Sequence, residues 1–241
     1  MIDRQKLIDY AADYGIDVSR ETAERLDEFA ALLAEWNQKI NLTAITDPEG
    51  MLIKHLLDSL TLLPRLPKGP CSLIDVGTGA GFPGIPLALM RPDIQVTLLD
   101  SLQKKTRYLQ DVCDRLSIPA QILTMRAEQA GTDPALRERF DVATARAVAA
   151  MPVLCEYCLP LVKVGGRFLA MKGPDGEAEA AQAAGAVARL GGAPVCCDTL
   201  QLPGRAYPEP SVRKILLVEK KQTTPARYPR PSAKIAKQPL I

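Results

Sequence analysis

The sequence predicts an α/β fold built on a mainly parallel, seven-stranded sheet with helices on both faces, preceded by a helical extension. Three observations lead to this prediction. Strand-like and helix-like segments alternate from residue 71 onward, a glycine-rich loop follows the first strand, and the first 65 residues show only helical periodicity. We therefore expect an N-terminal helical extension over residues 1–65, an α/β domain over 66–221 and a basic, proline-containing tail over 222–241.

The helical extension should contain two amphipathic helices. Ser19 is a suitable N-cap for the first, and Pro48 suits the first position of the second because no N–H is needed there. We expect Trp36 in the core, since it continues the apolar stripe of the first helix. Apolar residues recur at three- and four-residue spacing in both segments: Leu26, Phe29, Leu32, Leu33 and Trp36, then Met51, Leu52, Leu56, Leu57 and Leu60.

The α/β domain should contain seven strands and four long helices. The predicted strands span residues 72–76, 94–100, 120–125, 141–145, 165–171, 195–201 and 212–219. The predicted helices span residues 83–90, 103–116, 151–162 and 176–190. No helical segment separates the last two strands, and the loop between them contains proline and glycine. These two strands should therefore pair antiparallel at one edge of the sheet.

Composition and charge exclude some classes of protein. The chain is 47% hydrophobic and 24% charged with a net charge of +2, and no apolar run is long enough to span a membrane. The N-terminus lacks the apolar segment of a secretory signal, so we expect a cytoplasmic protein with no membrane partner. Residues 220–241 carry six lysines and arginines and no acid, which indicates either a polyanion partner or a disordered solubilising tail.

A metal site is not expected, although Cys155 and Cys158 form a C-x-x-C pair. Zinc would need further ligands, and the chain has a single histidine, His55. We favour the interpretation that these two thiols are buried in the core.

The glycine-rich loop after the first strand should bind a ligand. Its residues Gly79-x-Gly81-x-x-Gly84 match the dinucleotide fingerprint. However, Asp75 ends the strand, and no lysine or arginine occurs from residue 73 to residue 90. A carboxylate there would repel a pyrophosphate, whereas it would suit the ammonium and sulfonium groups of S-adenosylmethionine. The loop therefore favours S-adenosylmethionine over NAD, with Gly77 and Gly79 allowing its close approach.

Acidic residues also follow the second and third strands. Asp100 ends the second strand, 23 residues after Gly77, where a carboxylate accepts hydrogen bonds from ribose hydroxyls. The alternative is an N-cap for the following helix. Glu128 follows the third strand, at the edge expected beside the adenine; the alternative is a solvated surface glutamate.

Several longer motifs resemble one family. They are Trp36-Asn37 with Asn41-Leu-Thr43, Lys54-His55-Leu-Leu-Asp58-Ser59, Asp75-Val-Gly-Thr-Gly-Ala-Gly-Phe-Pro-Gly-Ile-Pro86, Leu99-Asp100-Ser101, Ala145-Arg146-Ala147 and Met171-Lys172-Gly173. Together they resemble the bacterial 16S ribosomal RNA guanine-N7 methyltransferases, also called glucose-inhibited division protein B. The resemblance extends from about residue 20 to residue 220.

The resemblance implies a Rossmann-like class I methyltransferase that methylates N7 of a guanine in the 530 loop of 16S RNA, position 527. It implies a cofactor site formed by Gly77, Phe82, Asp100, Ser101, Leu102, Ala127, Glu128 and Arg146. The tail matches in Arg227-Tyr-Pro-Arg230 and Pro239-Leu240, but its centre, residues 231–236, departs from the family's Pro-Gly-containing version.

The chemistry agrees with N7 as the target. That nitrogen carries a free lone pair at neutral pH, so no general base is needed. The fourth strand ends in Ala145-Arg146-Ala147 and lacks the motif that holds an exocyclic amine, and no cysteine nucleophile is expected near the cofactor. We expect Arg146 to position the methionine carboxylate or the guanine O6; the alternative is a surface ion pair.

The partner should be 16S RNA or a small-subunit particle, bound by a monomer. Local basic residues should contact it: Lys172, Arg205, Arg213, Lys214, Arg227 and Arg230. His55 and Asp58 lie one helical turn apart, and we favour a role in pinning the extension to the sheet over a role as a cap on the substrate side. Two other functions stay open: methylation of a small molecule or protein, and RNA binding without catalysis.

Overall fold

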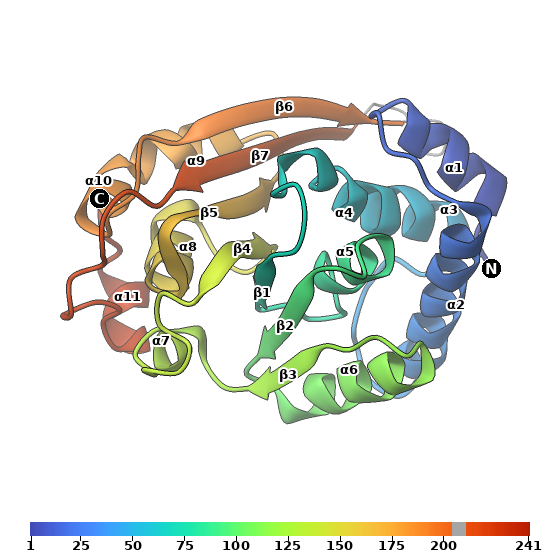
Figure 1. Cartoon of the computed structure of the whole chain (residues 1–241), viewed down its shortest axis with the longest axis horizontal. Coiled ribbons are helices and arrows are strands. Elements are labelled where there is room, and N and C mark those ends of the chain that lie inside the picture. Colours follow the sequence, from blue (N-terminus) through green and yellow to red (C-terminus); the bar gives the residue numbers. More distant parts are fainter. Residues whose placement is uncertain (204–210) are drawn as a thin grey trace.

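The computed structural model describes residues 1–203 and 211–241, and its centre is one seven-stranded sheet (Figure 1). The strand order is β3-β2-β1-β4-β5-β7-β6. Strand β7 runs antiparallel to both of its neighbours, and the other pairs are parallel. The strands are β1 (Ser72–Val76), β2 (Gln95–Asp100), β3 (Gln121–Thr124), β4 (Phe140–Arg146), β5 (Val162–Lys172), β6 (Cys196–Leu202) and β7 (Ser211–Glu219). The predicted fold class is confirmed, including the antiparallel pair at the edge.

Helices cover both faces of the sheet. In Figure 1 one group lies to its right: α1 (Arg4–Ala12), α2 (Arg20–Asn37), α3 (Pro48–Gly50), α4 (Asp58–Leu60), α5 (Gly84–Met90) and α6 (Gln103–Arg115). The other group lies to its left: α7 (Ala127–Ala130), α8 (Met151–Cys158), α9 (Gly176–Gln182), α10 (Ala184–Arg189) and α11 (Ser232–Lys237). Successive strand residues point to opposite faces, so Leu73 joins the core under the first group and Ile74 joins the core under the second.

The N-terminal helices share a hydrophobic core with the sheet. Ser19 caps α2 by accepting a hydrogen bond from the amide of Thr22, and Pro48 opens the next helix after the N-cap Asp47, as predicted. This helix continues from α3 to α4 through a π-helical segment, Met51–Leu57, which no periodicity indicated. Trp36 is only partly buried, because its indole N–H reaches the carboxylate of Asp111 at 2.7 Å.

Two predicted helices have different bounds in the structure, and three short helices were not specified. The predicted helix 151–162 ends at Cys158, because a 3₁₀ turn that contains Pro160 leads directly into β5. The predicted helix 176–190 breaks at Ala183 into α9 and α10. The three short helices are α1, α7 and α11. The predicted burial of Cys155 and Cys158 is confirmed, and burial raises the pKa of both thiols, that of Cys155 to about 12.

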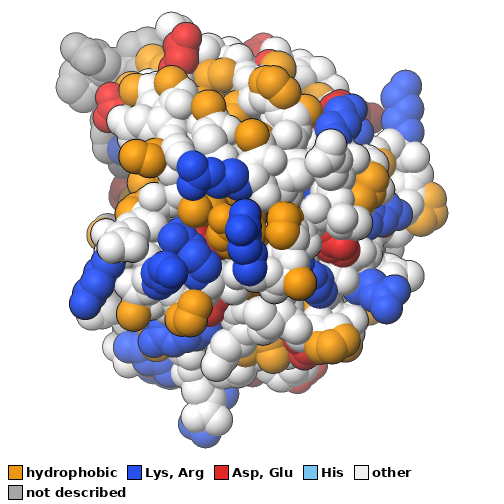
Figure 2. All heavy atoms as spheres, turned by 90° about the vertical axis from the view of Figure 1, so that its left-hand side faces the viewer, with side chains coloured by type: hydrophobic (Ala, Val, Ile, Leu, Met, Phe, Trp, Pro, Cys, Tyr) orange, Lys and Arg blue, Asp and Glu red, His pale blue; other side chains and the backbone are white. Residues whose placement is uncertain are grey.

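The tail is folded against α8 and α10, so its interpretation as a disordered segment is wrong. Tyr228, Ile235 and Leu240 are buried, and the guanidinium of Arg230 forms an ion pair at 2.7 Å with the fully buried Glu156. Other lysine and arginine side chains gather near the middle of this face (Figure 2). No helix among residues 1–203 and 211–241 has the length and apolar character needed to cross a membrane.

Candidate active site

A cavity of about 350 Å³ opens at the carboxyl ends of β1, β2 and β4, the edge where doubly wound sheets bind ligands. Its volume lies within the usual range for small-molecule sites. It gathers six of the predicted cofactor residues: Gly77, Asp100, Ser101, Leu102, Ala127 and Glu128. The apolar part of its lining is formed by Val76, Leu99, Leu102, Met125, Val148 and Tyr157.

Asp100 joins the glycine loop to the start of α6. Its Oδ2 accepts a hydrogen bond from the amide of Gly79 at 3.1 Å, and its Oδ1 accepts one from the amide of Leu102 at 2.9 Å. Asp100 does not cap α6, because that helix begins at Gln103 and Leu102 occupies its N-cap position. Each carboxylate oxygen has a second lone pair for a ligand hydroxyl. The interpretation as a helix cap is therefore wrong, and the carboxylate lines the cavity.

The prediction that Asp75 faces the ligand is wrong. Its carboxylate is fully buried beneath the glycine loop, where it accepts hydrogen bonds from the amide of Gly84 and the hydroxyl of Thr144, both at 2.9 Å. Burial raises the pKa of the Asp75 carboxyl, and these hydrogen bonds oppose that rise. Asp75 holds the loop and the first turn of α5 in place, whereas the acids that line the cavity are Asp100 and Glu128.

The structure also argues against NAD, but the reason is not the repulsion by Asp75 that the sequence suggested. Dinucleotide-binding folds place the pyrophosphate against free N–H groups at the start of the helix that follows the glycine loop. Here the amide of Gly84, at the start of α5, already donates to the internal carboxylate of Asp75. The amide of Ile85 donates to the carbonyl of Gly81, and Pro83 and Pro86 carry no N–H. The first turn of α5 is therefore closed to a phosphate.

Two other predicted cofactor residues lie outside this cavity. Gly79 is adjacent to it, with its amide bound to Asp100 and a positive φ of 60° that suits glycine. Phe82 is buried, and its ring stacks on the imidazole of His55 with a centroid separation of 4.6 Å. The guanidinium of Arg146 lies 4.9 Å from the centroid of the same ring. Phe82 therefore supports a neighbouring site.

That neighbouring site is a second cavity of about 420 Å³, which shares Ala147 with the first. Its wall combines residues from the N-terminal extension, from the carboxyl ends of β4 and β5, from α9 and from β7. They are Ile45, Lys54, His55, Asp58, Arg146, Ala147, Met171, Lys172, Gly173, Glu179 and Arg213. Arg146, predicted as a cofactor contact, therefore lines the second cavity and not the first.

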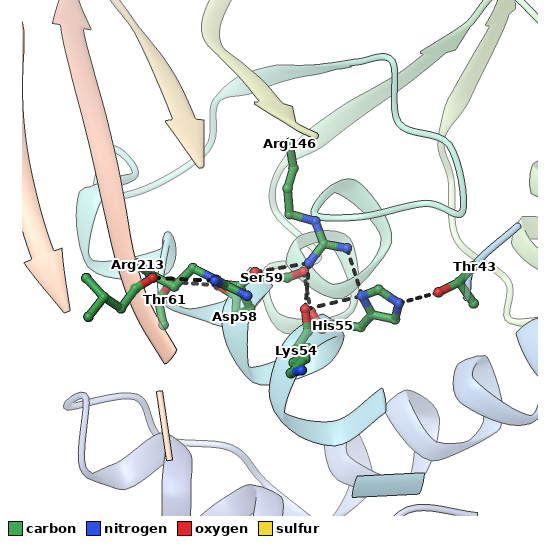
Figure 3. A network of polar contacts seen from close by, with 9 residues as sticks. Thr43, Lys54, His55, Asp58, Ser59, Thr61, Arg146 and Arg213 are labelled. Carbon is green, nitrogen blue, oxygen red and sulfur yellow. Dashed lines mark hydrogen bonds and ion pairs between the residues drawn. The ribbon is translucent and has the colours of Figure 1, made fainter. Parts of the chain in front are cut away.

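Arg146 crosses from β4 to the helix of the N-terminal extension (Figure 3). One guanidinium nitrogen donates to the carbonyl of Lys54 at 2.9 Å and to Asp58 Oδ2 at 3.1 Å. Arg213 donates to the other oxygen of Asp58 at 3.2 Å. The Asp58 side chain is only 4% exposed, so this is a buried bridge and the interpretation of Arg146 as a surface ion-pair residue is wrong. Burial raises the pKa of Asp58, and both guanidinium groups oppose this rise.

His55 completes the network as a neutral side chain. Its Nδ1 lies 3.1 Å from a guanidinium nitrogen of Arg146 and 3.2 Å from the carbonyl oxygen of Lys54. Its Nε2 lies 2.7 Å from Thr43 Oγ1, so both ring nitrogens have polar partners. Burial and the adjacent guanidinium lower the pKa of His55 to about 3. Together with Asp58, this residue ties the extension to the sheet, which agrees with the interpretation favoured from the sequence.

Two of the predicted RNA contacts are held by acidic side chains of the protein itself. Lys172 binds Glu179 and the carbonyl of Ala149, while Lys214 binds Glu177 and Thr199. Arg205 lies outside the described residues.

The prediction for Arg230 is wrong, because Glu156 and the carbonyl of Gln238 hold its guanidinium. Arg227 is exposed and lies 5.1 Å from the ring of Tyr228. Of the predicted tail contacts, only Arg227 presents its charge to solvent.

Sequence analysis missed Glu179 and Lys105. Glu179 follows Glu177 on a short helix, and acidic residues in such a segment are usually exposed to solvent, so no sequence pattern singled it out. Lys105 lines the first cavity, 3.6 Å from the carboxylate of Asp100. Its spacing of five residues from Asp100 would place it on the first turn of the next helix, which is the one signal that could have identified it.

The chain matches the model of a family described as rRNA small subunit methyltransferase G over residues 22–205. It is 43% identical to the ribosomal RNA small subunit methyltransferase G of Acetivibrio thermocellus over 238 residues, which cover 98% of this chain and 96% of that protein. It is 45% identical to the protein of the same name from Clostridium beijerinckii over 234 residues, covering 95% of each.

Solved structures at much lower identity share the fold. A precorrin-6y C5,15-methyltransferase from Geobacter metallireducens has a TM-score of 0.51 at 15% identity, covering 76% of this chain and 92% of that one. A SAM-dependent O-methyltransferase from Thermotoga maritima has a TM-score of 0.50 at 14% identity, covering 80% and 73%. These likenesses confirm the class I methyltransferase fold. The family model and the full-length relatives establish that this chain belongs to the rRNA small subunit methyltransferase G family, as its sequence motifs predicted.

Proposed function

We propose that this protein uses S-adenosylmethionine to methylate N7 of a guanine, position 527 in the 530 loop, of 16S ribosomal RNA. One observation supports this beyond family membership. The cofactor cavity and the second cavity share Ala147 in their walls, so a base bound in the second would lie beside a methyl donor bound in the first. The first cavity has a carboxylate for a ribose and apolar walls for an adenine, and its adjoining helix is closed to phosphate.

Residues of the first cavity fit the cofactor. Asp100 would hold the ribose hydroxyls, Ala127 and Glu128 would lie beside the adenine, and Gly77 would pass close to the methionine part. When bound, the cofactor supplies the electrophilic methyl group. The protein's task is to hold the acceptor base in line with that group, which itself accounts for a large part of the rate in such reactions.

Asp100→Ala should weaken S-adenosylmethionine binding by about 10- to 150-fold, the loss expected for hydrogen bonds to a charged group. Isothermal titration calorimetry measures this change directly. Asp111→Ala is a matched control, because Asp111 lies on the outer part of α6 and binds Trp36 instead of lining the cavity. Unchanged affinity in a folded Asp100→Ala protein would place the cofactor elsewhere.

The second cavity suits an acceptor that needs no deprotonation. His55 is neutral, but Arg146 occupies its Nδ1 and Thr43 its Nε2. Both oxygens of Asp58 are engaged by arginines. Guanine N7 presents a lone pair at neutral pH, so its methylation needs neither His55 nor Asp58 as a base. The absence of a free base among these groups therefore favours N7 over the exocyclic amine.

RNA binding also involves the folded tail. Arg189 from α10 and Arg227 and Lys234 from the tail line one surface pocket. In Figure 1, α10 and α11 lie on the left, the side that faces the viewer in Figure 2. All three basic side chains are exposed, and no ion pair neutralises them among residues 1–203 and 211–241. We assign this basic pocket to the phosphate backbone of the RNA.

Replacing Arg227 and Lys234 with alanine should remove two phosphate contacts. The slope of log affinity for 16S RNA against log salt should become shallower by about 1.4–1.8, since each contact contributes about 0.7–0.9. Filter binding over a salt series gives the slope, and the affinity for S-adenosylmethionine should not change. Lys68→Ala is the control, because Lys68 is exposed and does not line this pocket. An unchanged slope in the double variant would exclude this surface from RNA binding.

The proposed reaction has a direct assay. N7 methylation leaves a fixed positive charge on guanine, which makes the base open to borohydride reduction and the strand open to aniline scission. RNA treated with the protein and the cofactor should break at one guanine of the 530 loop. Absence of any break, with methyl incorporation elsewhere, would overturn the proposed function. We further propose that the enzyme acts in the cytoplasm as a monomer, on 16S RNA or on a small-subunit particle.

A further inference from the structure

We infer that the second cavity is the binding site of the target base and that Glu179 identifies the base as guanine by accepting hydrogen bonds from its N1–H and its N2 amine. This inference rests on the proposed function, because it assumes that N7 is methylated where the two cavities meet. It assigns a specificity role to a residue outside the family motifs on which the sequence analysis relied.

The orientation of the base follows from the position of the methyl donor. N7 must face Ala147, which the two cavities share. O6 is adjacent to N7 on the guanine ring, so it faces the neighbouring cation, Arg146. The Watson–Crick edge then points away from Ala147, and we infer that it meets the part of the wall that Lys172 and Glu179 form beside Ala149 and Met151. A base removed from its stack is commonly recognised by hydrogen bonds to that edge.

Of the two acids in this cavity, only Glu179 has an oxygen available. Asp58 is 4% exposed, and each of its oxygens accepts from an arginine. Glu179 is 27% exposed. Its Oε2 accepts from the amide of Met151 and from Lys172 Nζ, both at 2.7 Å. Its Oε1 has no hydrogen-bond partner within the described part of the chain.

The fixed geometry of Glu179 makes it a selective acceptor. The contacts to Met151 and Lys172 hold one oxygen, so the second is aimed without further ordering of the side chain. An ionised carboxylate can only accept, and guanine is the RNA base that presents two donors side by side on its Watson–Crick edge. Adenine and the pyrimidines place an acceptor at one or both of these positions. Glu179 therefore favours guanine and penalises the other bases.

Inosine provides the test, because it keeps N7, O6 and N1–H and lacks only the N2 amine. The wild-type protein should methylate a 530-loop RNA with inosine at the target about 10- to 100-fold less efficiently in kcat/KM than the guanine RNA. In Glu179→Gln the amide oxygen will turn to the Met151 N–H, which leaves an NH₂ group facing the base. Methylation of the guanine RNA should fall about 10- to 100-fold, and the guanine-to-inosine ratio should approach about 1.

Lys172→Met separates specificity from support of the cavity wall. It breaks the same ion pair but leaves the carboxylate of Glu179 and its contact with the Met151 amide, so the guanine-to-inosine ratio should stay well above that of Glu179→Gln even if the rate falls. Calorimetry with S-adenosylmethionine confirms that each variant is folded. Equal use of guanine and inosine by the wild type, or an unchanged ratio in Glu179→Gln, would overturn the inference. Failure of the wild type to methylate N7 at all would instead overturn the proposed function.

Discussion

Asp58→Ala should lower the free energy of unfolding by about 3–5 kcal/mol, the cost of removing one partner from a buried ion pair. The Asp58 side chain bridges Arg146 on β4 and Arg213 on β7, at 3.1 and 3.2 Å. Without it, two guanidinium groups that are 14% and 23% exposed face each other with no counter-charge. Urea denaturation followed by circular dichroism measures the loss.

A matched variant separates burial from ion pairing in general. Asp198→Ala removes a similar aspartate–arginine contact, 2.8 Å from Arg65, but Asp198 is 45% exposed. Its loss should cost at most about 1 kcal/mol, because water and salt replace most of the interaction at the surface. If Asp58→Ala costs no more than Asp198→Ala, then the Arg146 network does not hold the extension on the sheet, and our description of this wall of the second cavity is wrong.

Local patterns made most of the fold predictable. The strand Ser72–Val76 is buried on both faces and is bounded by turn residues, so its predicted limits agree with the structure. Asp100 could also be placed correctly, because the carboxyl ends of parallel strands meet at one edge of the sheet regardless of side-chain detail. Such predictions need only the direction of the chain, which periodicity and loop residues provide.

Side-chain direction and distant packing were not predictable in this way. Asp100 ends β2, whereas Asp75 is the penultimate residue of β1 and lies under the loop, where it accepts from the amide of Gly84 and the hydroxyl of Thr144. The tail was unpredictable for a related reason. Its anchor, Glu156, lies 74 residues before Arg230, and no local pattern links them. Glu179 enters the site only because α9 follows β5 across the end of the sheet.

Replacing the target guanine with 7-deazaguanine should abolish turnover altogether, the largest effect that we expect. The substitution exchanges N7 for a C–H group and leaves O6, N1 and the N2 amine in place. The contacts assigned to Arg146 and Glu179 are therefore retained, and RNA affinity should stay near its wild-type value. Only the lone pair that accepts the methyl group is lost. Methylation of any other guanine atom would not depend on this change.

The comparison of these two RNAs tests the central claim most directly. A 530-loop RNA with guanine or 7-deazaguanine at the target position is incubated with the protein and radiolabelled S-adenosylmethionine, and methyl incorporation and RNA binding are measured together. We predict full incorporation into the guanine RNA, none into the deaza RNA, and equal binding of both. Methylation of the deaza RNA at the target nucleotide would contradict the account, because the acceptor would then be an atom other than N7.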